Sequence, residues 1–203
     1  MVYSYSAGAV QPRIFGYLNC VDKLTWNPKT WFWHLIGHTA RVYEKPGTRE
    51  LYVYESTTLN KGVSGVQLVD FGEWLKARKD CHVYYRACTF YREWQQVSAE
   101  HWYAVHIKYN LGKPYPDLKQ WRWRWYVANA AIDLDIKQLE NVQQNKMIFC
   151  TQLSADLDKS CTILAFNENP SEWEPDDCRE GGRLDDKHSS DVIIGPELEI
   201  CYG

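Results

Sequence analysis

The stretch from Thr39 to Ala87 constrains the fold more than any other part of the sequence. Four segments in it are rich in β-branched and aromatic residues, a composition typical of strands; they are Thr39–Glu44, Glu50–Ser56, Gly65–Asp70 and Cys81–Ala87. A Lys45-Pro46-Gly47-Thr48 turn joins the first two and predicts a β-hairpin. Apolar residues at helical spacing in Phe71–Arg78 predict a short helix before the last strand. We therefore expect an antiparallel sheet in an α+β fold.

Three further segments are expected to be helical. The first is Ser98–Tyr109, with Ser98 as N-cap and Glu100 in its first turn, and it ends near Gly112-Lys113-Pro114. The second is Gln120–Ile132, in which tryptophans alternate with arginines before an Ala-rich continuation. The third begins at Cys150, because Leu153, Leu157 and Cys161 follow at helical spacing. Residues 1–16 are expected to form an arm or an early edge strand.

A chain of 203 residues, 45% of them hydrophobic and 24% charged, is expected to form one soluble globular domain. The net charge of -3 is unevenly distributed, because residues 167–203 hold 11 acidic side chains against 3 basic ones. We divide the chain into a domain over residues 1–166 and an acidic extension over residues 167–203. Apolar residues such as Ile193 and Leu198 predict that the extension packs on the same domain. The alternative is that it docks on a basic partner protein.

The sequence gives no signal for export, membrane insertion or a bound cofactor. Its start lacks the basic and apolar pattern of a secretory signal, and no apolar run is long enough to span a membrane. The seven cysteines are odd in number and contain no CxxC pair, which argues against a disulfide framework or a zinc knuckle. We expect a reduced compartment, no cofactor and no metal.

Three residues have the chemistry of a cysteine hydrolase. A thiol at a helix start, as expected for Cys150, faces unpaired N–H groups and the positive end of the helix dipole, which favour the thiolate. His38, at the start of the first strand, is a candidate general base. Glu55, on the paired strand, is a candidate to orient the imidazole ring. Each also has a structural interpretation: a small core residue, a satisfied strand-end histidine and a surface charge.

A set of six segments resembles the YiiX/YebB-like branch of the NlpC family, the circularly permuted papain-like cysteine hydrolases. In chain order they are His38-Thr39-Ala40-Arg41-Val42-Tyr43, Leu51-Tyr52-Val53-Tyr54-Glu55-Ser56, Gly65-Val66-Gln67-Leu68, Tyr84-Tyr85-Arg86, Gly112-Lys113-Pro114-Tyr115 and Phe149-Cys150-Thr151-Gln152-Leu153. The family's histidine, glutamate and cysteine motifs read "GHT", "VYES" and "FCTQL" here. The resemblance implies a permuted papain-like fold in which the nucleophile helix packs against an antiparallel sheet, with Cys150 as nucleophile, His38 as base and Glu55 as orienting residue.

The same resemblance implies hydrolysis of amide bonds in peptidoglycan peptides or related cell-wall material. Related permuted folds act on lipid acyl chains, so an acyl hydrolase or acyltransferase is an alternative, and a relic module in a phage particle is another. The chain departs from the family at Gly16-Tyr17-Leu18-Asn19, where a Gly-Asp dipeptide is usual, and at Thr151 and Gln152. We expect a cytoplasmic enzyme, or a virion-associated one if a phage encodes it.

Two other patterns indicate different sites, and we weigh both against the hydrolase. His34 and His38 have the spacing of two zinc ligands on a helix, but Gly37 interrupts that helix and the glutamate of a zinc peptidase is missing. Trp121, Trp123 and Trp125 alternate with arginines and could stack on bases. Because residues 1–166 carry only a mild positive excess, we expect no nucleic-acid partner.

Overall fold

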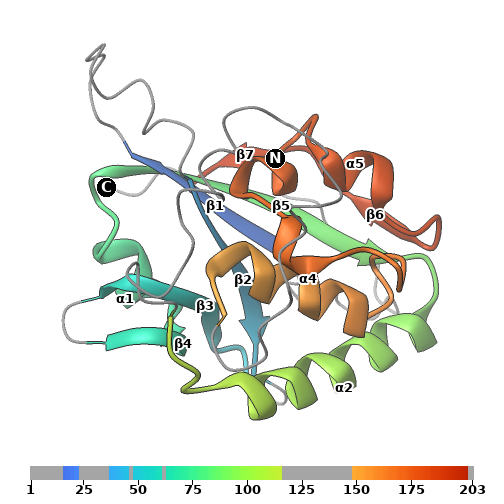
Figure 1. Ribbon diagram of the computed structural model, residues 1–203, viewed down its shortest axis with the longest axis horizontal. Helices are drawn as coiled ribbons and strands as arrows, with labels where there is room; N and C mark the ends of the chain where they lie inside the picture. The colour runs from blue at the N-terminus through green and yellow to red at the C-terminus, as the bar shows by residue number, and fades with distance from the viewer. Residues whose placement is uncertain (1–15, 23–36, 46–47, 61–62, 116–147, 201–203) are drawn as a thin grey trace, which may run out of the picture.

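The computed structural model describes residues 16–22, 37–45, 48–60, 63–115 and 148–200 (Figure 1). Within these ranges the fold is mixed α+β, built on an antiparallel sheet of seven strands in the order β4-β3-β2-β1-β5-β6, with β7 also paired to β5. The strands are β1 (Gly16–Asp22), β2 (His38–Glu44), β3 (Leu51–Asn60), β4 (Val63–Asp70), β5 (Cys81–Phe90), β6 (Val192–Ile194) and β7 (Leu198–Glu199). The expected α+β class and antiparallel sheet are therefore confirmed.

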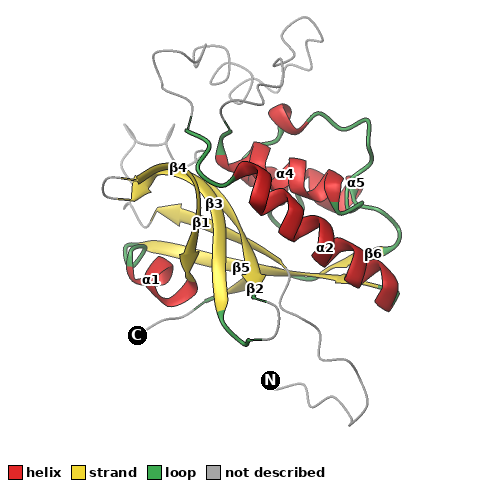
Figure 2. Ribbon diagram, turned by 90° about the horizontal axis from the view of Figure 1, so that it is seen from below, coloured by secondary structure: helices red, strands yellow, loops and turns green. Residues whose placement is uncertain are grey.

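Helices pack on both faces of this sheet (Figure 2). The helices are α1 (Phe71–Lys76), α2 (Glu93–Asn110), α4 (Cys150–Ser160) and α5 (Arg183–Lys187), with 3-10 turns at η3 (Pro170–Glu172) and η4 (Pro175–Cys178). The long helices α2 and α4 lie together on one face, and α1 covers the other. None of the helices in the described ranges combines the length and apolar character that crossing a bilayer requires.

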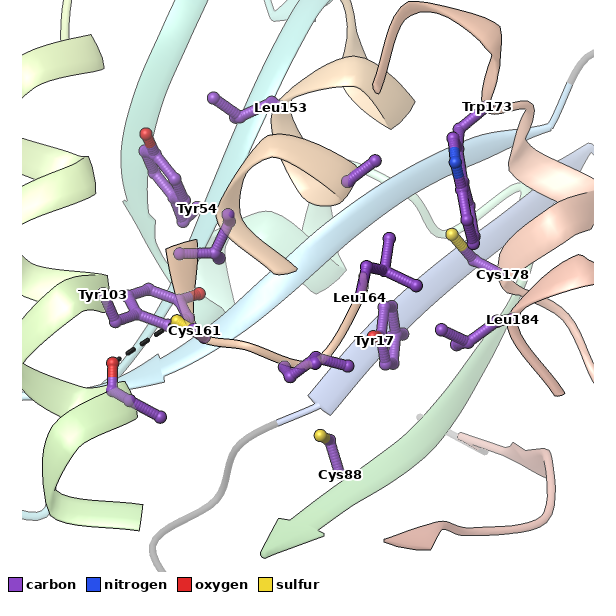
Figure 3. Packing of buried hydrophobic residues seen from close by; sticks show 14 of the residues in the cluster. Tyr17, Tyr54, Cys88, Tyr103, Leu153, Cys161, Leu164, Trp173, Cys178 and Leu184 are labelled. Carbon is purple, nitrogen blue, oxygen red and sulfur yellow. Dashed lines mark hydrogen bonds between the residues drawn. The ribbon is translucent and has the colours of Figure 1, made fainter. Parts of the chain in front are cut away.

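Alternation along the strands divides the apolar core into two parts. Tyr17 and Tyr54 point to the α4 face and pack with Leu153 and Leu157 of that helix, as part of the cluster in Figure 3. Their neighbours on the strands point to the α1 face and pack around Trp74; this second set is Leu18, Cys20, Ala40, Val42, Val53 and Val83. The strands between the two layers are therefore buried on both sides.

Residues 170–200 complete the sheet rather than extend away from it. Strands β6 and β7 both pair with β5. Arg86 of β5, which is 2% exposed, donates to the main-chain oxygens of Cys178, Arg179 and Gly195, and it forms an ion pair with Asp185. One buried guanidinium thus binds four points of the C-terminal segment to the middle of the fold.

One expectation from the sequence needs correction, and one strand was not expected. Ser98 is not an N-cap: α2 begins at Glu93 after Arg92, whose side chain makes no capping hydrogen bond, and Ser98 lies exposed inside the helix. The unexpected strand is β1, which lies between β2 and β5 in the sheet. The helix expected over Gln120–Ile132 and the arm before Gly16 lie outside the described residues.

The outer side of β4 contacts the segment that leads toward the helix α4. Val66 donates its N–H to the oxygen of Lys113 at 2.8 Å, and Gly112 donates to the oxygen of Val66 at 2.9 Å. Gly65 makes this approach possible: its φ is +119°, and a Cβ there would collide with the carbonyl oxygen of Lys113. Pro114 then accepts a hydrogen bond from the N–H of Ile148 at 3.2 Å, two residues before Cys150.

We predict that Gly65→Ala destabilises the fold more than Gly112→Ala does. Both glycines have a positive φ, but a Cβ at Gly112 would meet nothing within 4 Å, so that variant measures backbone strain alone. The expected loss is about 1–2 kcal/mol for Gly112→Ala and about 3 kcal/mol for Gly65→Ala, which adds the collision. Urea unfolding of the two variants checks this. Equal losses would contradict the close approach of Lys113 to β4.

Candidate active site

The candidate site forms where two neighbouring strands separate. The register of β2 with β3 runs from Glu44↔Leu51 to Arg41↔Tyr54 and stops there, whereas β2 stays paired with β1 as far as His38. The chain before α4 enters at this end of the strands, where the Ser56 hydroxyl donates to the main-chain oxygen of Ile148. The first residue of α4 is therefore brought to the open end of the β2–β3 pair.

His38 and Glu55 meet across this opening. His38 lies opposite Cys20 on the α1 face of the sheet, at the first residue of β2. Its Nε2 is 2.7 Å from Oε2 of Glu55, and both side chains are buried. Since the Glu55 carboxylate is ionised, as its pKa below indicates, the His38 Nε2–H is the donor. The bond fixes the tautomer and the orientation of the ring, and Nδ1 is the nitrogen left for another partner.

Glu55 is fully buried and held by donors from three other segments. Gln67 of β4 donates to Oε1 at 2.7 Å, the Trp74 indole of α1 donates to Oε2 at 2.8 Å, and Arg78 donates to Oε2 at 2.7 Å. Burial alone raises the pKa of Glu55, but the hydrogen bonds and charges of His38 and Arg78, with the Trp74 bond, outweigh it and lower the pKa to about 2. The carboxylate is therefore negative at any physiological pH.

Cys150 is the first residue of α4, following Phe149 at the N-cap position. Burial raises the pKa of its thiol, but a hydrogen bond to His38, the charge of that ring, and N–H groups of Thr39 and Thr151 lower it below the ordinary value. The same contacts act on the ring: burial lowers the pKa of His38, and the bonds to Cys150 and Glu55 together raise it to about 9. These directions favour a thiolate–imidazolium pair at neutral pH.

Asn19 of β1 braces the strand that carries these contacts. Its Oδ1 accepts from the Thr39 hydroxyl at 2.8 Å, and its Nδ2 donates to the main-chain oxygen of Cys178 at 3.3 Å. Asn19 is 2% exposed, so both bonds are made away from water. The N–H that Thr39 directs at Cys150 therefore belongs to a residue whose side chain is also held.

The structure places the three residues selected from the sequence, His38, Glu55 and Cys150, in one constellation. They come from different faces of the sheet. Helix α4, with Cys150, packs on one face, whereas the strand alternation directs the side chains of His38 and Glu55 to the other. Contact is possible because His38 is the end residue of β2 and Cys150 the end residue of α4. His34, the other residue of the two-histidine spacing, lies outside the described residues, as do Trp121, Trp123 and Trp125. Among the described residues no group of three or more His, Cys, Asp or Glu is arranged to hold a metal ion.

Four residues around this constellation were not selected from the sequence. Gln67 is the register partner of Glu55, so an antiparallel alignment of the expected strands Glu50–Ser56 and Gly65–Asp70 could have identified it. Trp74 and Arg78 reach Glu55 only because α1 folds back on the sheet, and the helical spacing of Phe71–Arg78 gives no sign of this contact. Tyr115 lies near the thiol, since burial and then the charge of Cys150 raise the pKa of its hydroxyl.

A scan against models of known protein families found no match to this chain, and a search of curated proteins likewise found none.

We predict that Cys150 reacts with iodoacetamide at a lower pH than an ordinary thiol. Its rate should reach half of its maximum well below the free-thiol pKa of ~8.5, because the ion pair with His38 favours the thiolate. Peptide mass spectrometry across a pH series measures this, with the more exposed Cys81 as the internal control. His38→Ala should move the Cys150 midpoint upward. A Cys150 midpoint no lower than that of Cys81 would contradict the activated thiol.

We predict that Glu55 contributes a distinct acid-sensitive part of the stability. Because its pKa is lowered to about 2 in the fold, its contribution is present above the unfolded pKa of ~4.3 and is lost as the pH falls toward 2. The loss should be about 3 kcal/mol. Glu55→Gln should remove this loss and destabilise the fold at pH 7, since Arg78 is left buried without its anion.

Urea unfolding between pH 7 and pH 2 tests this acid sensitivity. Glu73→Gln is the matched control, because Glu73 is an exposed carboxylate in the same region, paired only with Lys76 on its own helix. It should leave the wild-type pH dependence intact. An unchanged acid transition in Glu55→Gln would show that the buried carboxylate does not carry the effect.

Proposed function

We propose that this protein is a cysteine hydrolase that cleaves amide bonds by acyl transfer through Cys150. The observation that carries the proposal is the buried chain of contacts from the Cys150 thiol to the His38 ring and on to Glu55. A buried carboxylate, an imidazole oriented by it and a thiol at a helix start are the three parts of a cysteine nucleophile. The lowered thiol pKa and the raised imidazole pKa are the directions that such a nucleophile needs.

The reaction follows from these positions. The Cys150 thiolate attacks the carbonyl carbon, and the N–H of Cys150 is available to the oxyanion because the first N–H of a helix has no acceptor within it. The His38 imidazolium gives its proton to the leaving amine, which breaks the C–N bond and leaves a thioester. His38, now neutral, takes a proton from water, and the resulting hydroxide releases the acid and frees Cys150.

The topology supports a fold of permuted papain-like type. The strand with His38 and the strand with Glu55 precede the helix with Cys150 in the chain, as in the permuted branch that the sequence resembles. The nucleophile helix α4 packs against the antiparallel sheet beside β2 and β3. Thr151, which departs from the family motif, donates its hydroxyl hydrogen bond to the main-chain oxygen of Trp173, so this residue has a bracing role at the helix start.

We propose the amide bonds of peptidoglycan peptides or related cell-wall material as the substrate, on the strength of the resemblance. Lipid acyl transfer is the second candidate, because a thioester on Cys150 serves esters as well as amides. A relic module in a phage particle is the third; it predicts an unreactive Cys150. The cellular setting proposed with the first candidate is the cytoplasm, or a virion for a phage-encoded protein.

We predict a graded loss of hydrolysis across the three residues. Cys150→Ala should abolish turnover, and His38→Ala should come close to it, because the thiolate and the proton donor are then lost. Glu55→Gln should retain about 100-fold more activity than either, since it disturbs only the orientation and charge of the ring. The measurement is release of peptide from purified cell wall, run beside release of fatty acid from phospholipid.

Thermal unfolding of each variant separates lost chemistry from lost structure. Cys150→Ala should unfold close to the wild-type temperature, because a helix N-terminal position does not require a thiol for packing. Cys81→Ala serves as the control for cysteine replacement and should retain activity. Full activity in the Cys150→Ala variant on either substrate would rule out the hydrolase.

A further inference from the structure

We propose that Arg41 and Asp158 are positioning residues that hold the nucleophile helix α4 in register with the strand that carries His38. This inference rests on the proposed function, because it concerns the same Cys150–His38 contact. Arg41 belongs to β2, as His38 does, and Asp158 belongs to α4, as Cys150 does. The two pairs therefore join the same two elements at two places.

The second place is a fully buried ion pair. Nη2 of Arg41 is 3.0 Å from Oδ1 of Asp158, and Nη1 is 3.5 Å from Oδ2, so the guanidinium faces both carboxylate oxygens. Tyr17 of β1 donates its hydroxyl to Oδ2 at 2.9 Å, and its ring lies 3.6 Å from the guanidinium carbon. All three side chains are 0–1% exposed. The carboxylate is thus fixed by two strands at once.

The spacing of the two contacts is matched along the helix and along the strand. Asp158 comes eight residues after Cys150, which is about 12 Å of α-helix. Arg41 comes three residues after His38, which is about 10 Å of β-strand. Because the helix contacts the strand at two points with nearly equal separations, the helix has only one position along the strand. The second point therefore sets where the Cys150 sulfur falls relative to the His38 ring.

Stability alone does not explain this ion pair. Asp158 lies toward the C-terminal end of α4, where the helix dipole disfavours a negative charge. Burial raises the pKa of Asp158 to about 6 in spite of Arg41, Tyr17 and His106, so the charged form is expensive to keep there. Apolar contacts of Leu153 and Leu157 already hold α4 on the sheet, but such contacts are non-directional. A buried charge pair adds orientation where it adds little stability.

The test separates position from stability by removing both charges together. The double variant Arg41→Met/Asp158→Leu replaces both charged groups with apolar side chains, and buried ion pairs replaced by apolar residues often leave proteins as stable as before. Urea unfolding measures its stability, and the pH profile of Cys150 alkylation by iodoacetamide measures the site. We expect unfolding near the wild-type midpoint, a rate at pH 7 lowered about tenfold or more, and a profile moved toward the free-thiol midpoint of ~8.5.

Two single variants complete the design. Asp158→Asn should show the same altered alkylation profile of Cys150. If the double variant does not fold, the profile of Asp158→Asn decides whether the ion pair positions α4. Asp185→Asn is the matched control, because it removes the carboxylate from another buried arginine, Arg86, on a strand that carries no residue of the site. It should leave the alkylation profile of Cys150 unchanged.

The outcomes distinguish the inference from the function on which it rests. A folded double variant with the wild-type alkylation profile overturns the positioning role and leaves the hydrolase standing. An altered profile in Asp185→Asn as large as in Asp158→Asn overturns it too, since any loss of stability would then have the same effect. A wild-type Cys150 that reacts like an ordinary thiol overturns both.

Discussion

The Glu55 carboxylate is the interaction on which the arrangement depends. Four donors meet it, from β2, β4, α1 and the residue Arg78 just beyond that helix. Arg78 also lies over the Trp74 ring, 4.0 Å from its centroid, so the docking of α1 is governed by the charge as well as by apolar contact. Because the carboxylate is shielded from water, each of these bonds is stronger than it would be at the surface. The orientation of His38 follows from the position of Glu55.

Buried charges lie on both faces of the sheet, and β2 takes part in each set. On the α1 face Glu55 is bound by His38 and Arg78, and on the α4 face Arg41 is bound by Asp158. Alternation along the strand explains why His38 and Arg41, three residues apart, point to opposite faces. Polar groups in such positions must be satisfied by partners of fixed geometry. The sheet is thereby given a definite relation to both α1 and α4, which apolar packing alone would leave adjustable.

Local patterns predicted the strands β2 to β5, because the alternation and the turn residues in Thr39–Ala87 can each be recognised from a few neighbouring residues. They failed for β1, where Tyr17 and Asn19 are satisfied only by partners far along the chain, Asp158 and the Cys178 main chain. They also misplaced the start of α2, whose first turn has no capping side chain and is held by burial of Gln95 and Ala99.

The same distinction applies to the site. Cys150, His38 and Glu55 carry recognisable chemistry at recognisable positions, a helix start and two strands, so the sequence sufficed to select them. Trp74 and Arg78 have no such mark, because their role depends on the return of α1 across the sheet. Arg41 and Asp158 could not be selected from the sequence for the same reason, because nothing within either segment indicates that the two residues will lie opposite one another.

The pairing of β6 and β7 with β5, together with the Gly112–Lys113 contact on β4, means that the outer sides of the two long strands β5 and β4 both have neighbours. Outer strands with free N–H and C=O groups are templates for edge-to-edge association between molecules. The acidic C-terminal segment therefore also shields the backbone of β5 from other copies of the chain. Truncation of the chain after α4 would uncover that backbone beside the apolar residues under it, and the sheet would become liable to aggregate.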